Sequence, residues 1–187
     1  MNVQQTKLGG VLLIVPKVFA DDRGYFHESF RSCDYDAAGI CGPFVQDNIS
    51  YSKKGILRGL HYQYPHSQAK LVQVLSGEVA DVAVDIRTGS PTYGKWVMEI
   101  LSDQNHRQLY IPAGFAHGFC VLSDGAIFSY KCTEYYDAPS DGGVIWNDAD
   151  LNIDWPIDEP LLSDKDIALP RLCDIAADKL PGFEEAQ

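Results

Sequence analysis

The stretch Arg58-Gly59-Leu60-His61-Tyr62-Gln63, taken together with Pro112-Ala113-Gly114-Phe115-Ala116-His117-Gly118, decides the fold and much of the chemistry expected of this chain. The two stretches have the spacing of a two-part motif that binds a metal through His-x-His, a Glu seven residues before a Gly, and Pro-x-Gly-x-x-His. In this chain Gln63 replaces the second His, and Lys70 replaces the Glu, seven residues before Gly77. Of the usual metal ligands, only His61 and His117 remain.

These replacements change the chemistry that the site favours. A protonated Lys has no lone pair to offer a metal ion, and its charge repels one. We therefore expect no metal. A cavity that contains His61, Lys70 and Arg58 suits acid–base chemistry on an anionic substrate better than metal chemistry.

Most of the chain consists of short apolar stretches separated by turn residues, a pattern typical of a sandwich or barrel. Residues 80–86, with Ala80, Val82 and Val84 alternating with Asp81 and Asp85, predict a half-buried strand. Strands are expected at 10–15, 26–30, 44–51, 55–61, 80–86, 96–101, 109–111, 118–122 and 126–136, and short helices at 34–38 and 174–179. Such antiparallel strands most often close as a jelly roll that can hold a ligand. We predict an all-β protein, a cupin jelly-roll barrel with a few short peripheral helices.

Length and charge narrow the classes of protein further. At 187 residues without a visible linker or repeat, residues 1–187 are expected to form a single domain, with a tail at 170–187 that carries no motif. The 26 acidic and 15 basic residues give a net charge of −11, which argues against nucleic acid as a partner. A small anionic ligand remains possible where a few Arg and Lys side chains converge.

Five cysteines, an odd number without a Cys-x-x-Cys pair, favour buried thiols in a reducing compartment. They are Cys33, Cys41, Cys120, Cys132 and Cys173. The apolar run at 11–15 is too short for a signal peptide, and no stretch is long enough to span a membrane. We expect a cytoplasmic protein without a membrane partner.

His61 is the first candidate for chemistry. A single His in a strand is more often structural, but Arg58, Lys70 and a second His in the other half-motif favour a general base. The segment 21–28 fits a charged edge strand about equally well as a binding segment. In the second interpretation Arg23 binds a phosphate, and Phe19 or Phe26 stacks on a base.

Several motifs, in order along most of the chain, resemble those of the dTDP-4-dehydrorhamnose 3,5-epimerase family, which has a cupin fold. The matching pieces are Phe19-x-Asp21-x-Arg23-Gly24-x-Phe26-x-Glu28, Gln46-Asp47-Asn48-x-Ser50, Gly55-x-x-Arg58-Gly59-Leu60-His61-Tyr62-Gln63, Lys70-Leu71-Val72, Ile111-Pro112-x-Gly114-Phe115-Ala116-His117-Gly118-Phe119, Tyr130-Lys131-x-Thr133-x-Tyr135-Tyr136 and Leu162-Ser163-x-Lys165-Asp166. Any one of them is weak evidence, and together they are strong.

The resemblance implies epimerisation at C3 and C5 of dTDP-4-dehydro-6-deoxy-D-glucose, in dTDP-L-rhamnose biosynthesis. In this reading His61 is the base, Asp166 raises its basicity, Tyr130 is the acid on the opposite face, and Lys70 stabilises the enolate. No cofactor is implied, because the ketone itself is the electron sink.

Substrate-binding roles follow from the same resemblance. Arg58 and His117 line the sugar pocket, Gln46 and Asn48 bind the nucleotide, and Tyr136 and Phe19 enclose the thymine. Arg23 and Glu28 reach the nucleotide from a neighbouring subunit, because the N-terminal strands are exchanged in a homodimer.

Three alternatives remain open at this stage. The first is an epimerase that inverts only C3 or only C5 of a related dTDP-4-keto sugar. The second is a cupin that binds a nucleotide sugar without catalysis, which leaves His61, Asp166 and Lys70 unexplained. The third is a metal-dependent cupin oxygenase or isomerase, against which Lys70 and Gln63 argue.

Overall fold

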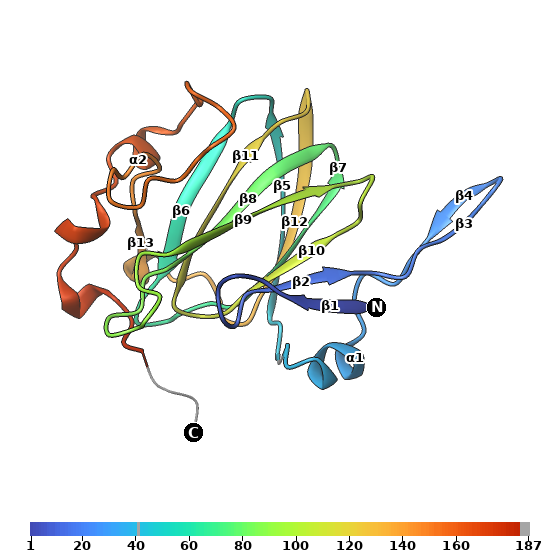
Figure 1. Ribbon diagram of the computed structural model, residues 1–187, viewed down its shortest axis with the longest axis horizontal. Coiled ribbons are helices and arrows are strands. Elements are labelled where there is room, and N and C mark those ends of the chain that lie inside the picture. Colours follow the sequence, from blue (N-terminus) through green and yellow to red (C-terminus); the bar gives the residue numbers. More distant parts are fainter. Residues whose placement is uncertain (41, 184–187) are drawn as a thin grey trace.

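Two β-sheets packed face to face form the body of the protein (Figure 1). The computed structural model describes residues 1–40 and 42–183, so Cys41 lies outside the described residues. In spatial order the larger sheet contains β1 (Asn2–Gln5), β2 (Leu12–Val15), β10 (Gln108–Ile111), β7 (Lys70–Ser76), β12 (Gly125–Cys132) and β5 (Gln46–Lys53). The smaller contains β13 (Asp141–Gly143), β6 (Leu57–Gln63), β11 (Phe115–Val121), β8 (Glu78–Asp85) and β9 (Trp96–Ser102). All pairings within them are antiparallel, which confirms the predicted jelly roll.

The main core fills the space between the sheets. Val72, Val74 and Phe128 of the larger sheet pack there with Phe115 and Phe119 of the smaller one. The rings of Phe119 and Phe128 stack with centroids 4.1 Å apart, and this contact packs β11 of one sheet against β12 of the other. This core occupies only part of the interior, because polar side chains take the inward positions at one end.

A second core covers the outer face of the five-stranded sheet. Ala80, Val82 and Val84 of β8 pack there under Trp155 and Leu172 of the C-terminal region. The expectation of a half-buried strand is therefore wrong, because both faces of β8 are covered. The part of the chain from residue 170 onward, coloured red in Figure 1, contributes Leu172 and Leu180 to this core although it carries no motif.

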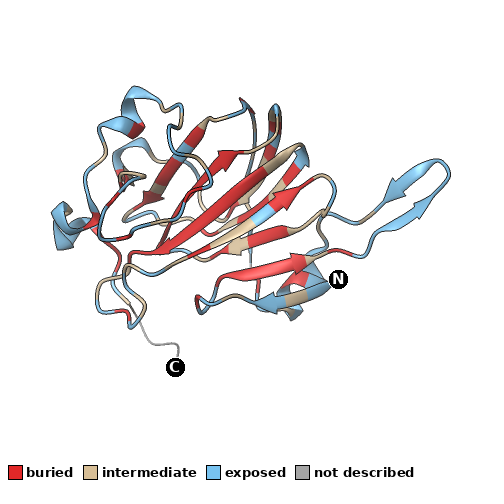
Figure 2. Ribbon diagram, turned by 45° about the horizontal axis from the view of Figure 1, so that its top comes forward, coloured by how far each residue is buried: buried red, intermediate tan, exposed pale blue. Residues whose placement is uncertain are grey.

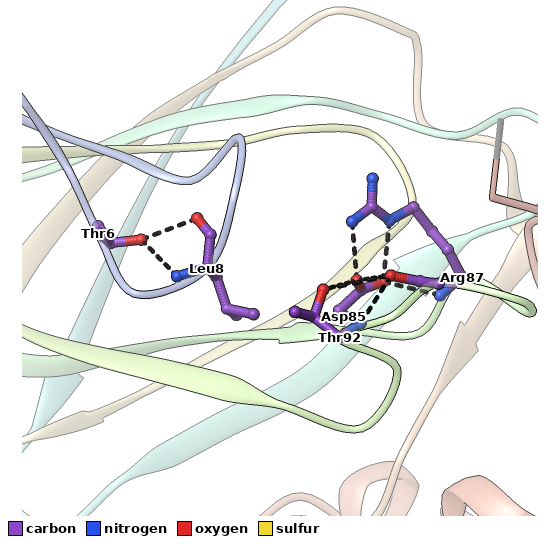
Figure 3. A network of polar contacts seen from close by, with 6 residues as sticks. Thr6, Leu8, Asp85, Arg87 and Thr92 are labelled. Atoms are coloured by element: carbon purple, nitrogen blue, oxygen red, sulfur yellow. Dashed lines mark hydrogen bonds and ion pairs between the residues drawn. The ribbon is translucent and has the colours of Figure 1, made fainter. Parts of the chain in front are cut away.

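A buried ionic cluster closes one end of β8. The Asp85 side chain is fully buried and accepts hydrogen bonds from the guanidinium of Arg87 at 2.7 and 2.9 Å and from the hydroxyls of Ser90 and Thr92 (Figure 3). Burial alone would raise the pKa of Asp85, but these donors outweigh it and hold the pKa below its usual value. The Arg87 guanidinium also lies 4.9 Å from the ring centre of Phe183, which ties the C-terminal region to the barrel.

One element projects away from the barrel. β3 (Phe19–Asp21) and β4 (Gly24–Phe26) form a separate two-stranded hairpin that is exposed over its whole length (Figure 2). Just after it, α1 (Ser32–Ala37) packs Tyr35 against Leu12 and Ile14 of β2. The hairpin thus leaves the barrel between two well-anchored segments.

Several predicted boundaries differ from the observed ones. Of the strand expected at 26–30, only Phe26 is in a strand, and the Ser29 carbonyl instead accepts hydrogen bonds from the side chains of Tyr35 and Gln108. The strand expected at 126–136 ends at Cys132, and beyond it the Glu134 carbonyl accepts a hydrogen bond from the Gln68 side chain. The helix expected at 174–179 is instead two short 3₁₀ turns, Leu172–Asp174 and Ala177–Lys179, since Leu172 and Leu180 must both reach the core. A third 3₁₀ turn spans Ala138–Ser140.

The helices are few and short. The helix α2 (Asp164–Ile167) lies beside β6, and the helix expected at 34–38 is found as α1. In the described part of the chain, no helix is long and apolar enough to cross a membrane.

Candidate active site

A pocket of about 380 Å³ opens at the end of the barrel where β6, β7, β12 and β5 come together. Both sheets contribute to its wall, so it lies between them. Its lining consists mostly of polar and aromatic side chains: Gln46, Asn48, His61, Tyr62, Gln63, Gln68, Lys70, Tyr130, Tyr136, Asp141 and Lys165. The pocket therefore gathers residues that are up to 119 positions apart, from Gln46 to Lys165.

His61 forms a dyad with Asp166. Its Nε2 lies 2.5 Å from Asp166 Oδ1, and Asp166 is almost completely buried while the imidazole remains partly open to the pocket. Ser163, the N-cap of α2, donates to Asp166 Oδ2 at 2.9 Å and accepts the Asp166 N–H. Burial would raise the pKa of Asp166, but His61 and Ser163 outweigh it and hold the pKa below its usual value. The carboxylate thus stays ionised beside the imidazole.

Lys70 enters the pocket from the start of β7. Burial lowers its pKa, while nearby Cys132, Asp81 and Asp141 counteract that effect. Within the described residues its ammonium makes no hydrogen bond or close ion pair, so its donors are available to a bound molecule. A desolvated cation with free donors is well suited to stabilise developing negative charge.

Tyr130 lines the pocket from β12. Burial raises the pKa of its phenol, and the thiol of Cys132 adds to this, while the charge of Arg58 opposes it. The phenol therefore remains protonated at neutral pH and can donate a proton. Arg58 itself is exposed, donates to Ser52 Oγ at 2.9 Å, and does not form part of the pocket wall.

His117 lies behind the pocket wall. Its Nε2 is 3.0 and 3.1 Å from the two carboxylate oxygens of Asp81, and both side chains are buried. Burial raises the pKa of Asp81, whereas His117 and Lys70 lower it. The inner side of β8 thus places a second carboxylate near the Lys70 ammonium.

Glycines in the two half-motifs permit this arrangement. Gly59 has a φ of 121°, and a Cβ on it would lie 2.6 Å from the Cα of Gly118. The close approach coincides with a register shift between the pairs His117–His61 and Phe119–Arg58, where β6 has one residue more than β11. It brings β6 and β11 together next to both histidines.

Metal ligands are not assembled here. In residues 1–40 and 42–183, no group of three His, Cys, Asp or Glu side chains is arranged to hold a metal ion. Gln63 and Lys70 do lie in the pocket wall, at the positions where the metal-binding motif has a His and a Glu. The pocket contains acid–base groups instead.

Comparison with known proteins gives a consistent answer. The model of the dTDP-4-dehydrorhamnose 3,5-epimerase family matches residues 5–174. The chain belongs to this family. An enzyme of that name from Shigella flexneri is 57% identical over 169 residues, which cover 89% of this chain and 93% of the relative.

Solved structures of similar proteins agree with the fold. A dTDP-6-deoxy-D-glucose-3,5-epimerase from Legionella pneumophila Philadelphia 1, in complex with dTDP-4-keto-L-rhamnose, is 52% identical with a TM-score of 0.96 over 98% of each chain. A 3'-monoepimerase from Streptomyces bikiniensis, in complex with dTDP-quinovose, is 37% identical with a TM-score of 0.87, covering 95% of this chain and 91% of that one. The resemblance drawn from the motifs is confirmed, and the chain is a sugar-nucleotide epimerase with the family's cupin fold.

The residues with implied catalytic roles are close together. His61, Lys70 and Tyr130 share one pocket, with Asp166 directly behind His61. Gln46, Asn48 and Tyr136, for which the family resemblance implies nucleotide binding, lie in the same wall. Gln46 donates to Asn48 Oδ1 at 3.1 Å and accepts the N–H of Tyr136 at 2.8 Å.

The other residues for which the family resemblance implies nucleotide binding lie outside this pocket. Phe19, Arg23 and Phe26 belong to the projecting hairpin, and none of them lines the pocket of its own chain. Arg23 forms an exposed pair with Asp21 at 2.6 Å, and Glu28 pairs with Arg31. Exposed pairs of this kind contribute little stability, so both charges can be redirected to a ligand.

Sequence reasoning missed several residues of the site. The sequence pattern indicates Asp81 only as the polar side of a strand, and Asp141 and Gln68 carry no local signal. Lys165 stood in a matching motif but received no role, although it pairs with Asp141 at the pocket. The Ser163-x-x-Asp166 spacing is a helix-start signal that could have located α2.

Proposed function

We propose that this pocket converts dTDP-4-dehydro-6-deoxy-D-glucose into dTDP-4-dehydro-L-rhamnose by inverting C3 and C5, a step of dTDP-L-rhamnose biosynthesis. The observation that carries the proposal is the His61–Asp166 dyad, in which Nε2 and Oδ1 are 2.5 Å apart, together with Lys70 and Tyr130 in the same pocket as His61. The Legionella relative, bound to dTDP-4-keto-L-rhamnose, supports the choice of substrate.

His61 begins each inversion. The C4 ketone acidifies the hydrogens on C3 and C5, so a base of moderate strength can remove them. When the Nε2 hydrogen of His61 is donated to Asp166, Nδ1 carries the lone pair that accepts the carbon-bound proton. The ionised Asp166 then stabilises the imidazolium that forms.

Lys70 stabilises the intermediate. Removal of the proton moves an electron pair onto the C4 oxygen and gives an enolate. The Lys70 ammonium, partly desolvated and free of hydrogen bonds to other described side chains, pairs with that oxygen. Stabilisation of such developing charge by donors already in place is usually the largest contribution to the rate.

Tyr130 completes the inversion. Its protonated phenol donates a proton to the opposite face of the same carbon, and the electron pair returns from the enolate to form the new C–H bond. His61 then releases its proton to water, and the Tyr130 phenolate recovers one from water. The substrate gains and loses one proton at each carbon, so no oxidant or reductant is needed.

The projecting hairpin supports a second proposal, that the protein acts as a homodimer with exchanged N-terminal strands. Phe19, Arg23 and Phe26 lie outside the pocket of their own chain, and with Glu28 they would complete the nucleotide site of a neighbouring subunit. Light scattering at micromolar concentration should show a dimer. A fully active monomer would exclude this arrangement.

A cytoplasmic location is also proposed. Cys33, Cys120, Cys132 and Cys173 are free thiols, as expected in a reducing compartment. Cys120 and Cys132 are buried, as the sequence predicts, but Cys33 and Cys173 are exposed and depart from that expectation.

An epimerase that inverts one carbon is the second candidate. The Streptomyces monoepimerase shares this fold at 37% identity, so the fold alone does not distinguish one inversion from two. NMR of the dTDP-4-keto sugar in deuterated water separates the candidates. Deuterium at both C3 and C5 is the expected result, deuterium at one carbon indicates a monoepimerase, and none indicates a protein that only binds.

A further inference from the structure

Gln63 uses its whole side-chain amide to join the segment that follows β6 to the loop at residues 133–137, which follows β12. It is the last residue of β6 and is only 7% exposed. Its Nε2 donates to the carbonyl oxygens of His66 at 2.8 Å and Tyr135 at 3.2 Å, and its Oε1 accepts the N–H of Asp137 at 3.0 Å. Two carbonyls on one side and an N–H on the other fix the orientation of the amide.

The two contacts with the loop lie on either side of Tyr136. The N–H of Tyr136 itself donates to Gln46 Oε1 at 2.8 Å, so three consecutive residues, 135 to 137, have a backbone group held by a glutamine. The phenol of Tyr136 donates to Asp141 Oδ2 at 3.2 Å. Although it is 59% exposed, Tyr136 is therefore held at both its backbone and its hydroxyl.

This restraint does not come from the sheet. β12 ends at Cys132, and residues 133–137 lie beyond the last pairing with β5 and β7. Among the described residues, Gln63 is the only one whose side chain hydrogen-bonds to the carbonyl of Tyr135 or the N–H of Asp137, so both groups lose that partner without it. Tyr136 would then keep only the contact of its N–H with Gln46 and that of its hydroxyl with Asp141, and its exposed ring could adopt more orientations.

We propose that Gln63, at the position where the metal-binding motif has its second His, is a positioning residue that presets Tyr136 to receive the nucleotide part of the substrate. The inference rests on the proposed function, because it assigns Tyr136 a nucleotide as its ligand. Gln63 acts through the loop, since all its donors and its acceptor are engaged within the protein. A preset ring loses less conformational freedom on binding, which strengthens affinity without any new contact.

The residue type fits this role. Only a primary amide offers two N–H donors on one side and an acceptor on the other, at this side-chain length. A Glu would direct oxygen atoms at the two carbonyls, and a His could not serve all three partners. At a position where the metal-binding motif has a ligand, this chain thus has a side chain that holds the loop.

The test compares binding with turnover in Gln63→Met, which keeps the side-chain length and removes all three hydrogen bonds. We expect the Kd for dTDP, measured by calorimetry, to rise about tenfold. Turnover at saturating substrate should fall by less than about threefold, because the amide does not bond to His61, Lys70 or Tyr130. The matched control is Ser123→Ala, at the opposite end of β12. Ser123 Oγ accepts the N–H of Glu78 and donates to the carbonyl of Gly125, and the loss of these two hydrogen bonds should leave the Kd for dTDP unchanged.

A double-mutant cycle shows whether Gln63 acts through Tyr136. In the Tyr136→Ala background, Gln63→Met should change the Kd for dTDP by less than about twofold, because the ring it positions is gone. An equal loss in both backgrounds, or wild-type affinity in Gln63→Met alone, overturns the inference. Should Gln63→Met not fold, Gln63→Glu, which removes the two donors and keeps the length, enters the same cycle.

Failure of the proposed function gives a different result. If the wild-type protein neither binds dTDP nor exchanges deuterium into the keto sugar, the function fails, and the inference fails with it. If the wild type does both and Gln63→Met binds equally well, only the positioning role is overturned.

Discussion

His61 and His117 face each other across the paired strands β6 and β11, but their imidazoles bind different carboxylates. His61 turns to Asp166 from α2 and remains open to the pocket, whereas His117 turns to Asp81 of β8 and is buried. One half-motif thus supplies a proton acceptor. The other supplies a buried pair that supports the pocket wall from behind.

The dyad predicts the effect of removing either partner. His61→Ala should abolish deuterium exchange at both carbons, and Asp166→Asn should slow it by about 10²–10⁴-fold, because the base loses the anion that supports it. Asp164→Asn, two residues earlier on the exposed side of α2, is the control and should keep wild-type exchange. Unimpaired exchange in His61→Ala would show that another residue is the base.

Tyr130→Phe should separate exchange from inversion. The variant keeps the ring and the base but lacks the proton donor on the far face. Deuterium should therefore enter C3 or C5 faster than the inverted sugar appears, as followed by NMR. Tyr135→Phe, an exposed tyrosine outside the pocket wall, is the control. If Tyr130→Phe inverts both carbons at the wild-type rate, Tyr130 is a packing residue.

Lys70 and Asp81 predict the alkaline limit of activity. Lys70 must be protonated, so activity is lost as pH rises through its pKa, which burial has lowered. The charge of Asp81 raises that pKa, and Asp81→Asn should therefore move the alkaline limb of the pH–rate profile to lower pH. An alkaline limb that does not move in Asp81→Asn would show that Lys70 does not set it.

Asp85 predicts a stability effect away from the pocket. Its folded pKa is depressed, so its contribution is fully present above the unfolded pKa of about 4 and is lost as pH falls through the folded pKa. Asp85→Asn should lower the free energy of unfolding at pH 7 by about 3 kcal/mol, because Arg87 stays partly buried without its partner. The free energy of unfolding, measured by urea denaturation, should differ less between pH 7 and pH 3 for the variant than for the wild type. Asp21→Asn, in an exposed pair with Arg23, should melt like the wild type at both values.

Much of the site could be predicted because its residues lie in short ordered motifs. Along β12 the alternation in sequence separates Phe128 and Cys132, which are buried, from Ile127, which is exposed. The chemistry also follows from local substitutions, since Lys70 and Gln63 occupy positions that a metal site needs for ligands. These conclusions require only neighbours in sequence.

What could not be predicted depends on contacts between distant segments. Asp166 lies 105 residues from His61, and only the family resemblance pairs them. On β8 the apolar residues Ala80, Val82 and Val84 face the C-terminal cover, while Asp81 faces the barrel interior. A pattern of alternation shows that two faces differ. It does not show which face lies inside, or that both are covered.

The projecting hairpin has a consequence for mixtures of defective subunits. In a dimer with exchanged hairpins, each nucleotide site draws its pocket from one chain and its hairpin from the other. A chain defective only in the hairpin, such as Arg23→Ala, can then lend its intact pocket to a partner defective in His61 that retains a normal hairpin. Each mixed dimer contains one whole site, so two inactive alleles expressed together should restore function that neither has alone.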